Sequence, residues 1–117
     1  MKVLLVDDNT FIRRVVRATL EAEGFTCLEA ATGAKALSAC WDELPDLCLL
    51  DLNLPDMDGL SVLRAVKSQE RTSGVRVFLL SGSDDADLPV KARRLGAEGC
   101  LTKPLSASDL AARLKGT

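Results

Sequence analysis

The chain has 117 residues, which is enough for one domain of ordinary size and too few for two. A hydrophobic share of 47% predicts a packed globule and argues against a disordered segment. With 15 basic and 17 acidic residues the net charge is -2, which argues against direct binding to nucleic acid or to an anionic membrane surface. The sequence contains no histidine, which excludes Ser-His and Cys-His nucleophile pairs and most zinc sites.

Short apolar runs alternate with amphipathic stretches along the whole chain. The apolar runs predict buried strands at 3–6, 26–30, 47–50, 75–80 and 99–102. Capping and stop residues predict helices from Asn9 or Thr10 to Gly24, from Thr32 to Pro45, after Asp58, over 87–95 and after Ser106 or Ser108. The apolar stripes expected to be buried are Phe11, Ile12, Val15, Val16, Thr19 and Leu20 on the first helix, and Leu37, Cys40, Trp41 and Leu44 on the second.

Strands that alternate with helices predict the α/β class, here a (βα)5 three-layer sandwich with a parallel sheet covered on both faces. Right-handed crossovers leave few topologies for such a sheet. No linker, repeat or low-complexity segment interrupts the pattern, so we expect one domain over residues 1–117. The final Gly116-Thr117 fits either a natural end or a point at which a longer protein has been cut.

The four cysteines, Cys27, Cys40, Cys48 and Cys100, have neither metal-ligand spacing nor a C-x-x-C pair, so we expect reduced, buried thiols. The first apolar run ends in two acids after four residues and is therefore not a signal peptide. No stretch approaches the ~18 apolar residues of a membrane span. A cytoplasmic location without membrane association is the expectation.

Polar side chains follow four of the predicted strands at their carboxyl ends. Asp7 and Asp8 follow the first strand, Asp51 the third, Ser81 the fourth and Lys103 the fifth. In an open parallel sheet these ends meet at one edge, which is where ligands bind. We therefore expect the acids, the hydroxyl and the lysine to lie close together.

Carboxylates crowded at such an edge repel one another, by ~4 kcal/mol for unit charges ~4 Å apart at an effective dielectric of 20. A raised pKa on one acid or a bound divalent cation would relieve the repulsion, and oxygen ligands with room for waters suit Mg²⁺. Phosphoryl transfer needs this combination of charge neutralisation and positioning, with a carboxylate as the nucleophile. The alternative for each acid taken singly is a helix N-cap or a solvated loop residue.

The sequence resembles the response-regulator receiver family of two-component signalling, the superfamily typified by CheY. The matching segments occur in the family's order and span nearly the whole chain: Val-Asp7-Asp8-Asn, Leu-Leu-Asp51-Leu-Asn53-Leu-Pro55-Asp56-Met-Asp58-Gly59, Leu-Leu-Ser81-Gly and Leu-Thr-Lys103-Pro104. One such segment would be weak evidence, but four in register are specific. The resemblance implies a flavodoxin-like sheet with strand order 2-1-3-4-5.

The resemblance also implies the roles of the site residues. They are Asp51 as phosphoacceptor, Asp8, Asp51 and the backbone carbonyl of Asn53 as metal ligands, Asp7 as the holder of a metal-bound water, Ser81 as the switch hydroxyl and Lys103 as the partner of a phosphoryl oxygen. The implied cofactor is Mg²⁺, with Mn²⁺ as the alternative ion. The protein would not be an enzyme in the ordinary sense, since it would catalyse only its own phosphorylation and dephosphorylation.

The phosphodonor implied by the family is a phosphohistidine on a histidine kinase or a histidine phosphotransfer protein. Because this chain lacks histidine, the donor must lie on another chain. The signal would pass to an unknown output protein or fused output domain. Partner binding would involve the first helix, with Phe11, Ile12, Arg13 and Val15 near the acids, although Phe11 and Ile12 are more commonly core residues.

One position departs from the family. Cys100 stands three residues before Lys103, where the family usually has Tyr or Phe, and a thiol cannot fill an aromatic pocket. A pseudo-receiver adaptor without a phosphate cycle is therefore the alternative function. Two enzyme classes fit less well. A haloacid-dehalogenase-like phosphatase would need an acid where Asn53 stands, and a flavodoxin would need a hydroxyl-rich loop where Asp7 and Asp8 stand.

Overall fold

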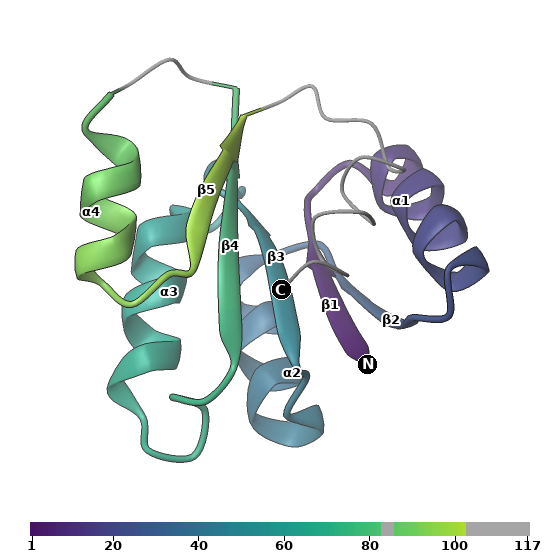
Figure 1. Cartoon of the computed structure of the whole chain (residues 1–117), viewed down its shortest axis with the longest axis horizontal. Helices are drawn as coiled ribbons and strands as arrows, with labels where there is room; N and C mark the ends of the chain where they lie inside the picture. The colour runs from purple at the N-terminus through teal and green to yellow at the C-terminus, as the bar shows by residue number, and fades with distance from the viewer. Residues whose placement is uncertain (83–85, 103–117) are drawn as a thin grey trace.

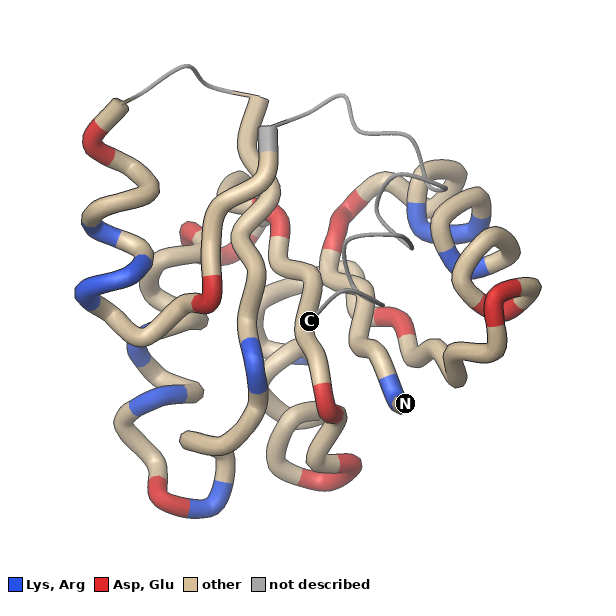
Figure 2. Tube along the Cα trace, in the orientation of Figure 1, with Lys and Arg blue, Asp and Glu red and all other residues tan. Residues whose placement is uncertain are grey.

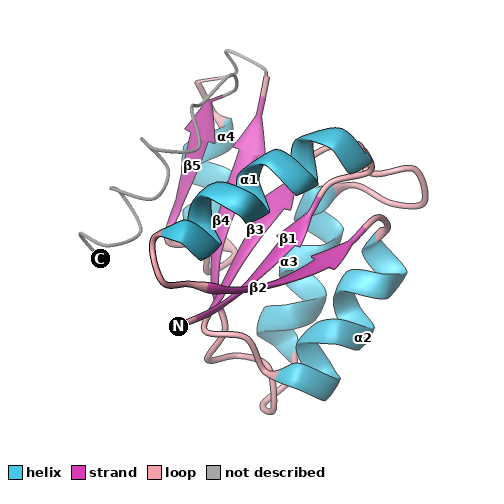
Figure 3. Ribbon diagram, turned by 90° about the vertical axis from the view of Figure 1, so that its right-hand side faces the viewer, coloured by secondary structure: helices cyan, strands magenta, loops and turns pink. Residues whose placement is uncertain are grey.

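The structure, a computed structural model, describes residues 1–82 and 86–102 and forms a parallel sheet with helices on both faces (Figures 1 and 3). The elements in chain order are β1 (Lys2–Val6), α1 (Thr10–Ala22), β2 (Thr26–Ala30), α2 (Gly33–Glu43), β3 (Leu47–Asp51), α3 (Gly59–Ser68), β4 (Arg76–Ser81), α4 (Leu88–Arg94) and β5 (Gly99–Thr102). The five strands have the order β2-β1-β3-β4-β5, which confirms the predicted topology. The predicted fifth helix lies outside the described residues.

Strand boundaries matter for function because they decide which residues stand at the carboxyl edge. β3 continues through Asp51 and β4 through Ser81, so both polar residues are the last residues of their strands. The register pairs Asp51 with Leu80, and the backbone N–H of Leu52 donates to the Leu80 carbonyl at 3.0 Å. Asp51 and the end of β4 are thus fixed relative to each other by the sheet ladder.

The predicted caps of the first three helices are confirmed. Asn9, Thr32 and Asp58 have extended backbones, and each side-chain oxygen accepts the backbone N–H three residues further on, at 3.0, 3.1 and 2.8 Å. Gly24 and Gly96 follow α1 and α4 with φ of 96° and 103°, a conformation that glycine adopts without strain. None of the helices in the described part of the chain is long and apolar enough to cross a membrane.

The core has two halves, one on each face of the sheet. Leu4 and Val6 of β1 belong to the half that also contains buried residues of α2, α3 and α4, whereas Val3 and Leu5 belong to the half with Leu20 of α1. Every residue of β3 is buried, as expected for a central strand covered on both faces. The strands that carry the acids are therefore the most enclosed part of the molecule.

The predicted apolar stripes of α1 and α2 are partly wrong. Phe11, Ile12 and Val15 are 76%, 41% and 46% exposed, while Arg13 of the same helix is buried. The hydrophobic pattern failed because Arg13 has acceptors beneath the helix, described below, and so takes an inward position. On α2 the exposed side chain of Trp41 instead stacks with Arg71, whose guanidinium carbon lies 5.1 Å from the ring centroid.

The four cysteines are free thiols, and three of them are buried, which agrees with the sequence prediction. Burial raises the pKa of Cys27 to about 11, so this thiol stays protonated at neutral pH. Cys100 is only partly buried, and it packs against the half of the core that contains α2, α3 and α4. Burial raises its pKa as well, which argues against a reactive thiolate.

The first residue of α3 offers a test of this architecture. A Cβ at Gly59 would lie 2.7 Å from the Asp51 carbonyl oxygen and 2.9 Å from the Leu52 Cα, both of them backbone atoms. We expect Gly59→Ala to lower the free energy of unfolding by about 1–3 kcal/mol, because the end of β3 must shift to make room. Gly74→Ala is the matched control, since no atom lies within 4 Å of that Cβ. Urea unfolding of both variants measures the change in stability. An equal loss of stability in Gly59→Ala and Gly74→Ala would contradict the prediction.

Candidate functional site

The candidate site lies at the carboxyl edge of the central strands. Asp7 and Asp8 directly follow β1, Asp51 ends β3 and Ser81 ends β4, and these three strands are neighbours in the sheet. Figure 2 shows acidic positions at the adjoining ends of β1 and β3. The structure therefore brings together the acids that the sequence predicted from separate strands, with Ser81 on the next strand.

The three acids form a compact group. One carboxylate oxygen from each of Asp7, Asp8 and Asp51 lies within 4.8 Å of the others. Asp7 and Asp51 are both 6% exposed, whereas Asp8 is exposed. A hard divalent cation fits such a donor set, because it prefers oxygen ligands and the open side at Asp8 leaves room for waters.

Local backbone bonds orient the two buried carboxylates. Asp7 accepts the N–H of Asn9 at 2.9 Å, and Asp51 accepts the N–H of Asn53 at 3.3 Å. Both are bonds to the residue two positions further on, a conformation for which Asp is well suited. The Asp7 backbone N–H also donates to the Ala30 carbonyl of β2 at 3.2 Å. The carboxylates are thus directed by the turns in which they stand.

The loop from β3 to α3, which contains Asn53, is tied to the start of α2. The carboxylate of Asp56 accepts the N–H of Gly33 at 2.8 Å and that of Ala34 at 3.0 Å. These two bonds hold the pKa of Asp56 below its usual range. No role for Asp56 was predicted from the sequence, although an acid that could accept the free N–H groups of a helix start is a recognisable feature.

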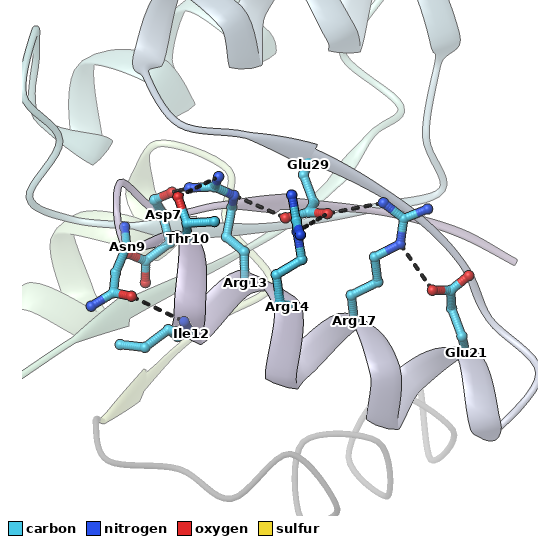
Figure 4. A network of polar contacts seen from close by, with 9 residues as sticks. All are labelled: Asp7, Asn9, Thr10, Ile12, Arg13, Arg14, Arg17, Glu21 and Glu29. Carbon is cyan, nitrogen blue, oxygen red and sulfur yellow. Dashed lines mark hydrogen bonds and ion pairs between the residues drawn. The ribbon is translucent and has the colours of Figure 1, made fainter.

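A second feature missed from the sequence is a group of charges beneath the site (Figure 4). Arg13 of α1 donates to the backbone carbonyl of Asp7 and to the carboxylate of Glu29 at the end of β2, the latter at 3.0 Å. Arg13 is 9% exposed and is therefore not part of the surface predicted for partner binding. Phe11, Ile12 and Val15 remain exposed on α1.

Two predicted residues have no structural description. Lys103 and the Pro104 that follows it lie outside the described residues. The predicted lysine contact with a phosphoryl oxygen therefore stays a prediction.

Comparison with known proteins identifies relatives of the whole chain. The profile of the response regulator receiver domain family matches residues 3–115. The phosphate regulon transcriptional regulatory protein PhoB of Pseudomonas aeruginosa is 36% identical over 113 residues, which cover 97% of this chain and 49% of that protein. The sporulation initiation phosphotransferase F of Bacillus subtilis is 32% identical over 109 residues, covering 93% and 86%. The chain spans about half the length of PhoB and of several similar transcriptional regulators.

Comparison with solved structures leads to the same family. The chemotaxis protein CheY4 of Vibrio cholerae matches with a TM-score of 0.91 and 30% identity, over 98% of this chain and 96% of that one. A CheY-like receiver domain protein from Methanospirillum hungatei has a TM-score of 0.90 at 30% identity, over 98% and 90%. These likenesses confirm the flavodoxin-like fold that the sequence predicted.

The link between Asp56 and α2 predicts a pH dependence of stability. A lowered pKa in the folded state means that the ionised carboxylate stabilises the fold at neutral pH, and that this stabilisation is lost as the pH falls through the lowered value. We expect Asp56→Asn to be less stable than wild type at pH 7, and the difference to shrink below about pH 4. Urea unfolding across this pH range measures it.

The control for this prediction is Asp42→Asn. Asp42 is an exposed acid on α2. Two results would contradict the prediction. Asp42→Asn could differ from wild type in stability as much as Asp56→Asn does, or the difference for Asp56→Asn could stay constant down to the lowest pH. Either result would show that the bonds from Asp56 to the helix start are not the source of the difference.

Proposed function

Since the chain belongs to the response regulator receiver family, we propose that residues 1–117 form one receiver domain that accepts a phosphoryl group on Asp51 in a Mg²⁺-dependent reaction. The observation that supports this most directly is the placement of Asp51. It ends the fully buried β3, and its carboxylate lies within 4.8 Å of carboxylate oxygens of Asp7 and Asp8. Burial of a single ionised acid would cost free energy there. A group of three acids suits a cation, and the bound cation could in turn attract an anionic substrate.

In this proposal Asp8 and Asp51 bind the cation through their carboxylates, Asn53 through its backbone carbonyl and Asp7 through a water. A bound Mg²⁺ would neutralise the acids and the incoming phosphoryl oxygens. Mn²⁺ would serve in the same way. The exposure of Asp8 beside two buried acids supports an ion that keeps part of its water shell.

The step on Asp51 is a displacement at phosphorus. A carboxylate oxygen of Asp51 forms the new O–P bond while the N–P bond of the donor phosphohistidine breaks, and the imidazole leaves with the electron pair. Ser81, 2% exposed at the end of β4, and Lys103 would each hold a phosphoryl oxygen. The protein would catalyse only this transfer and the later hydrolysis of its own aspartyl phosphate.

The donor would be a histidine kinase or a histidine phosphotransfer protein in the cytoplasm. The exposed apolar side chains of Phe11, Ile12 and Val15 on the helix that follows Asp7 and Asp8 support α1 as its contact surface. The output is either a separate protein or a fused domain, since PhoB is about twice as long as this chain. The charge of -2 gives no support for nucleic-acid binding by the chain itself.

The response to phosphorylation must work without the aromatic ring that the family usually has near the end of β5. Cys100 occupies that position and packs against the core between the sheet and α2, α3 and α4. A phosphoryl group adds nearly two negative charges, and Ser81 is the hydroxyl on the neighbouring strand that would follow it. In this proposal the change begins at Ser81, the last residue of β4.

Phosphorylation is testable with a small donor. We expect the wild-type chain, incubated with Mg²⁺ and acetyl phosphate, to gain one phosphoryl mass by mass spectrometry, because Asp51 needs only a cation and an activated phosphate. The added mass should be stable in acid and lost in base, as expected of an acyl phosphate. Asp51→Asn should remove the gain entirely, and chelation of Mg²⁺ should reduce it to background.

Asp42→Asn is again the control, because it removes an acid that lies outside the three-acid group. A mass gain in Asp51→Asn equal to that of wild type would place the phosphate elsewhere. Absence of any gain in the wild-type chain, together with absence of Mg²⁺ binding at millimolar concentration, would favour a pseudo-receiver that acts only as an adaptor.

A further inference from the structure

Arg13 is a buried cation that the proposed chemistry does not use. Its side chain is 10% exposed, whereas that of Arg14, the next residue on α1, is 69% exposed. Removing an arginine from water is costly unless its donors are satisfied. They are satisfied by acceptors from three segments: Glu29 on β2 at 3.0 Å, the Asp7 carbonyl after β1, and the Thr10 hydroxyl at 3.2 Å (Figure 4).

The carbonyl contact connects Arg13 with the site. That carbonyl belongs to the peptide group between Asp7 and Asp8, both of which contribute an oxygen to the three-acid group. The preceding peptide is held from β2, by the bond from the Asp7 N–H to Ala30. Arg13 thereby holds the peptide unit that joins the two acids.

Glu29 holds the guanidinium in place. Oε1 of Glu29 faces Arg13, while Oε2 lies 2.9 Å from Arg17 and 3.6 Å from Arg14. Burial alone would raise the pKa of Glu29, but hydrogen bonds from Arg17 and Arg13 outweigh it and hold the pKa below its usual range. Glu29 is therefore an ionised anchor at neutral pH, and its register partner is Leu5 of β1, two residues before Asp7.

We propose that Arg13, anchored by Glu29, is a positioning residue that holds the Asp7–Asp8 segment in the geometry required by the cation. This inference rests on the proposed function, since it assumes that the acids bind Mg²⁺. Mg²⁺ demands nearly ideal octahedral geometry, whereas Ca²⁺ accepts longer and less regular coordination. A residue that acts by positioning should therefore affect Mg²⁺ more than Ca²⁺.

Whether removal of Arg13 weakens or tightens Mg²⁺ binding distinguishes a positioning role from a purely electrostatic effect. Removal of a positive charge close to a cation site would, by electrostatics alone, tighten the binding of both ions. Loss of positioning predicts the opposite for Mg²⁺. A purely structural role predicts lower stability with an unchanged ratio of Mg²⁺ to Ca²⁺ affinity.

The test is titration of the intact chain with Mg²⁺ and with Ca²⁺, followed by calorimetry or NMR, with urea unfolding in parallel. We expect Arg13→Ala to weaken Mg²⁺ binding about tenfold or more, as is typical when a partner of a metal ligand is removed. Ca²⁺ binding should weaken by less than about threefold, so the affinity ratio falls. Arg14→Ala is the control, because Arg14 contacts Glu29 at 3.6 Å without touching Asp7, and both affinities should stay within about twofold.

Glu29→Gln is a second test variant, which serves if Arg13→Ala does not fold. It keeps the size of the side chain and removes the anchoring charge, so Mg²⁺ binding should again weaken more than Ca²⁺ binding. If wild type binds Mg²⁺ and both variants keep its affinity ratio within twofold, or bind Mg²⁺ more tightly, the role of Arg13 is refuted while the proposed function stands. If wild type binds neither ion, the proposed function fails and the inference fails with it.

Discussion

Mutual repulsion of carboxylates at one edge of the sheet is the constraint on which the rest of the molecule depends. Oxygens of Asp7, Asp8 and Asp51 lie within 4.8 Å of one another, and like charges at about 4 Å repel by several kcal/mol even when partly screened. Flexible loops would move apart under this force. Here the acids follow strands whose residues are almost completely enclosed, and β1 and β3 are paired side by side, so the fold opposes the repulsion.

Several separate segments of the chain orient the acids and the loop beside them. Turn bonds direct the carboxylates of Asp7 and Asp51, while Asp56 fastens the loop that contains Asn53 to the start of α2. Arg13 reaches the remaining peptide from the side of α1. Its guanidinium is paired with Glu29, which also contacts Arg14 and Arg17.

The sequence was sufficient to predict those features of the fold whose structural cause is local. Apolar runs predicted the strands, and Asn9, Thr32 and Asp58 could be recognised as caps because their partners are three residues away. Since parallel strands align their carboxyl ends, the grouping of Asp7, Asp8 and Asp51 followed as well. Contacts between distant residues were missed. Arg13 pairs with a residue 16 positions away and Asp56 with one 23 positions away, and no periodicity encodes such partners.

The error on α1 has a functional consequence. A pattern of hydrophobic residues assigns Phe11, Ile12 and Val15 to the core, but the burial of Arg13 turns these side chains outward. One helix thus presents an apolar surface suited to a protein partner on its outer side and holds the Asp7–Asp8 peptide on its inner side. Because Asn9 at the start of α1 and Arg13 within it both bond to Asp7, a shift of α1 would also affect the segment that carries Asp7 and Asp8. In the proposed function, the same helix would therefore bind the donor and hold the segment that carries two of the acids.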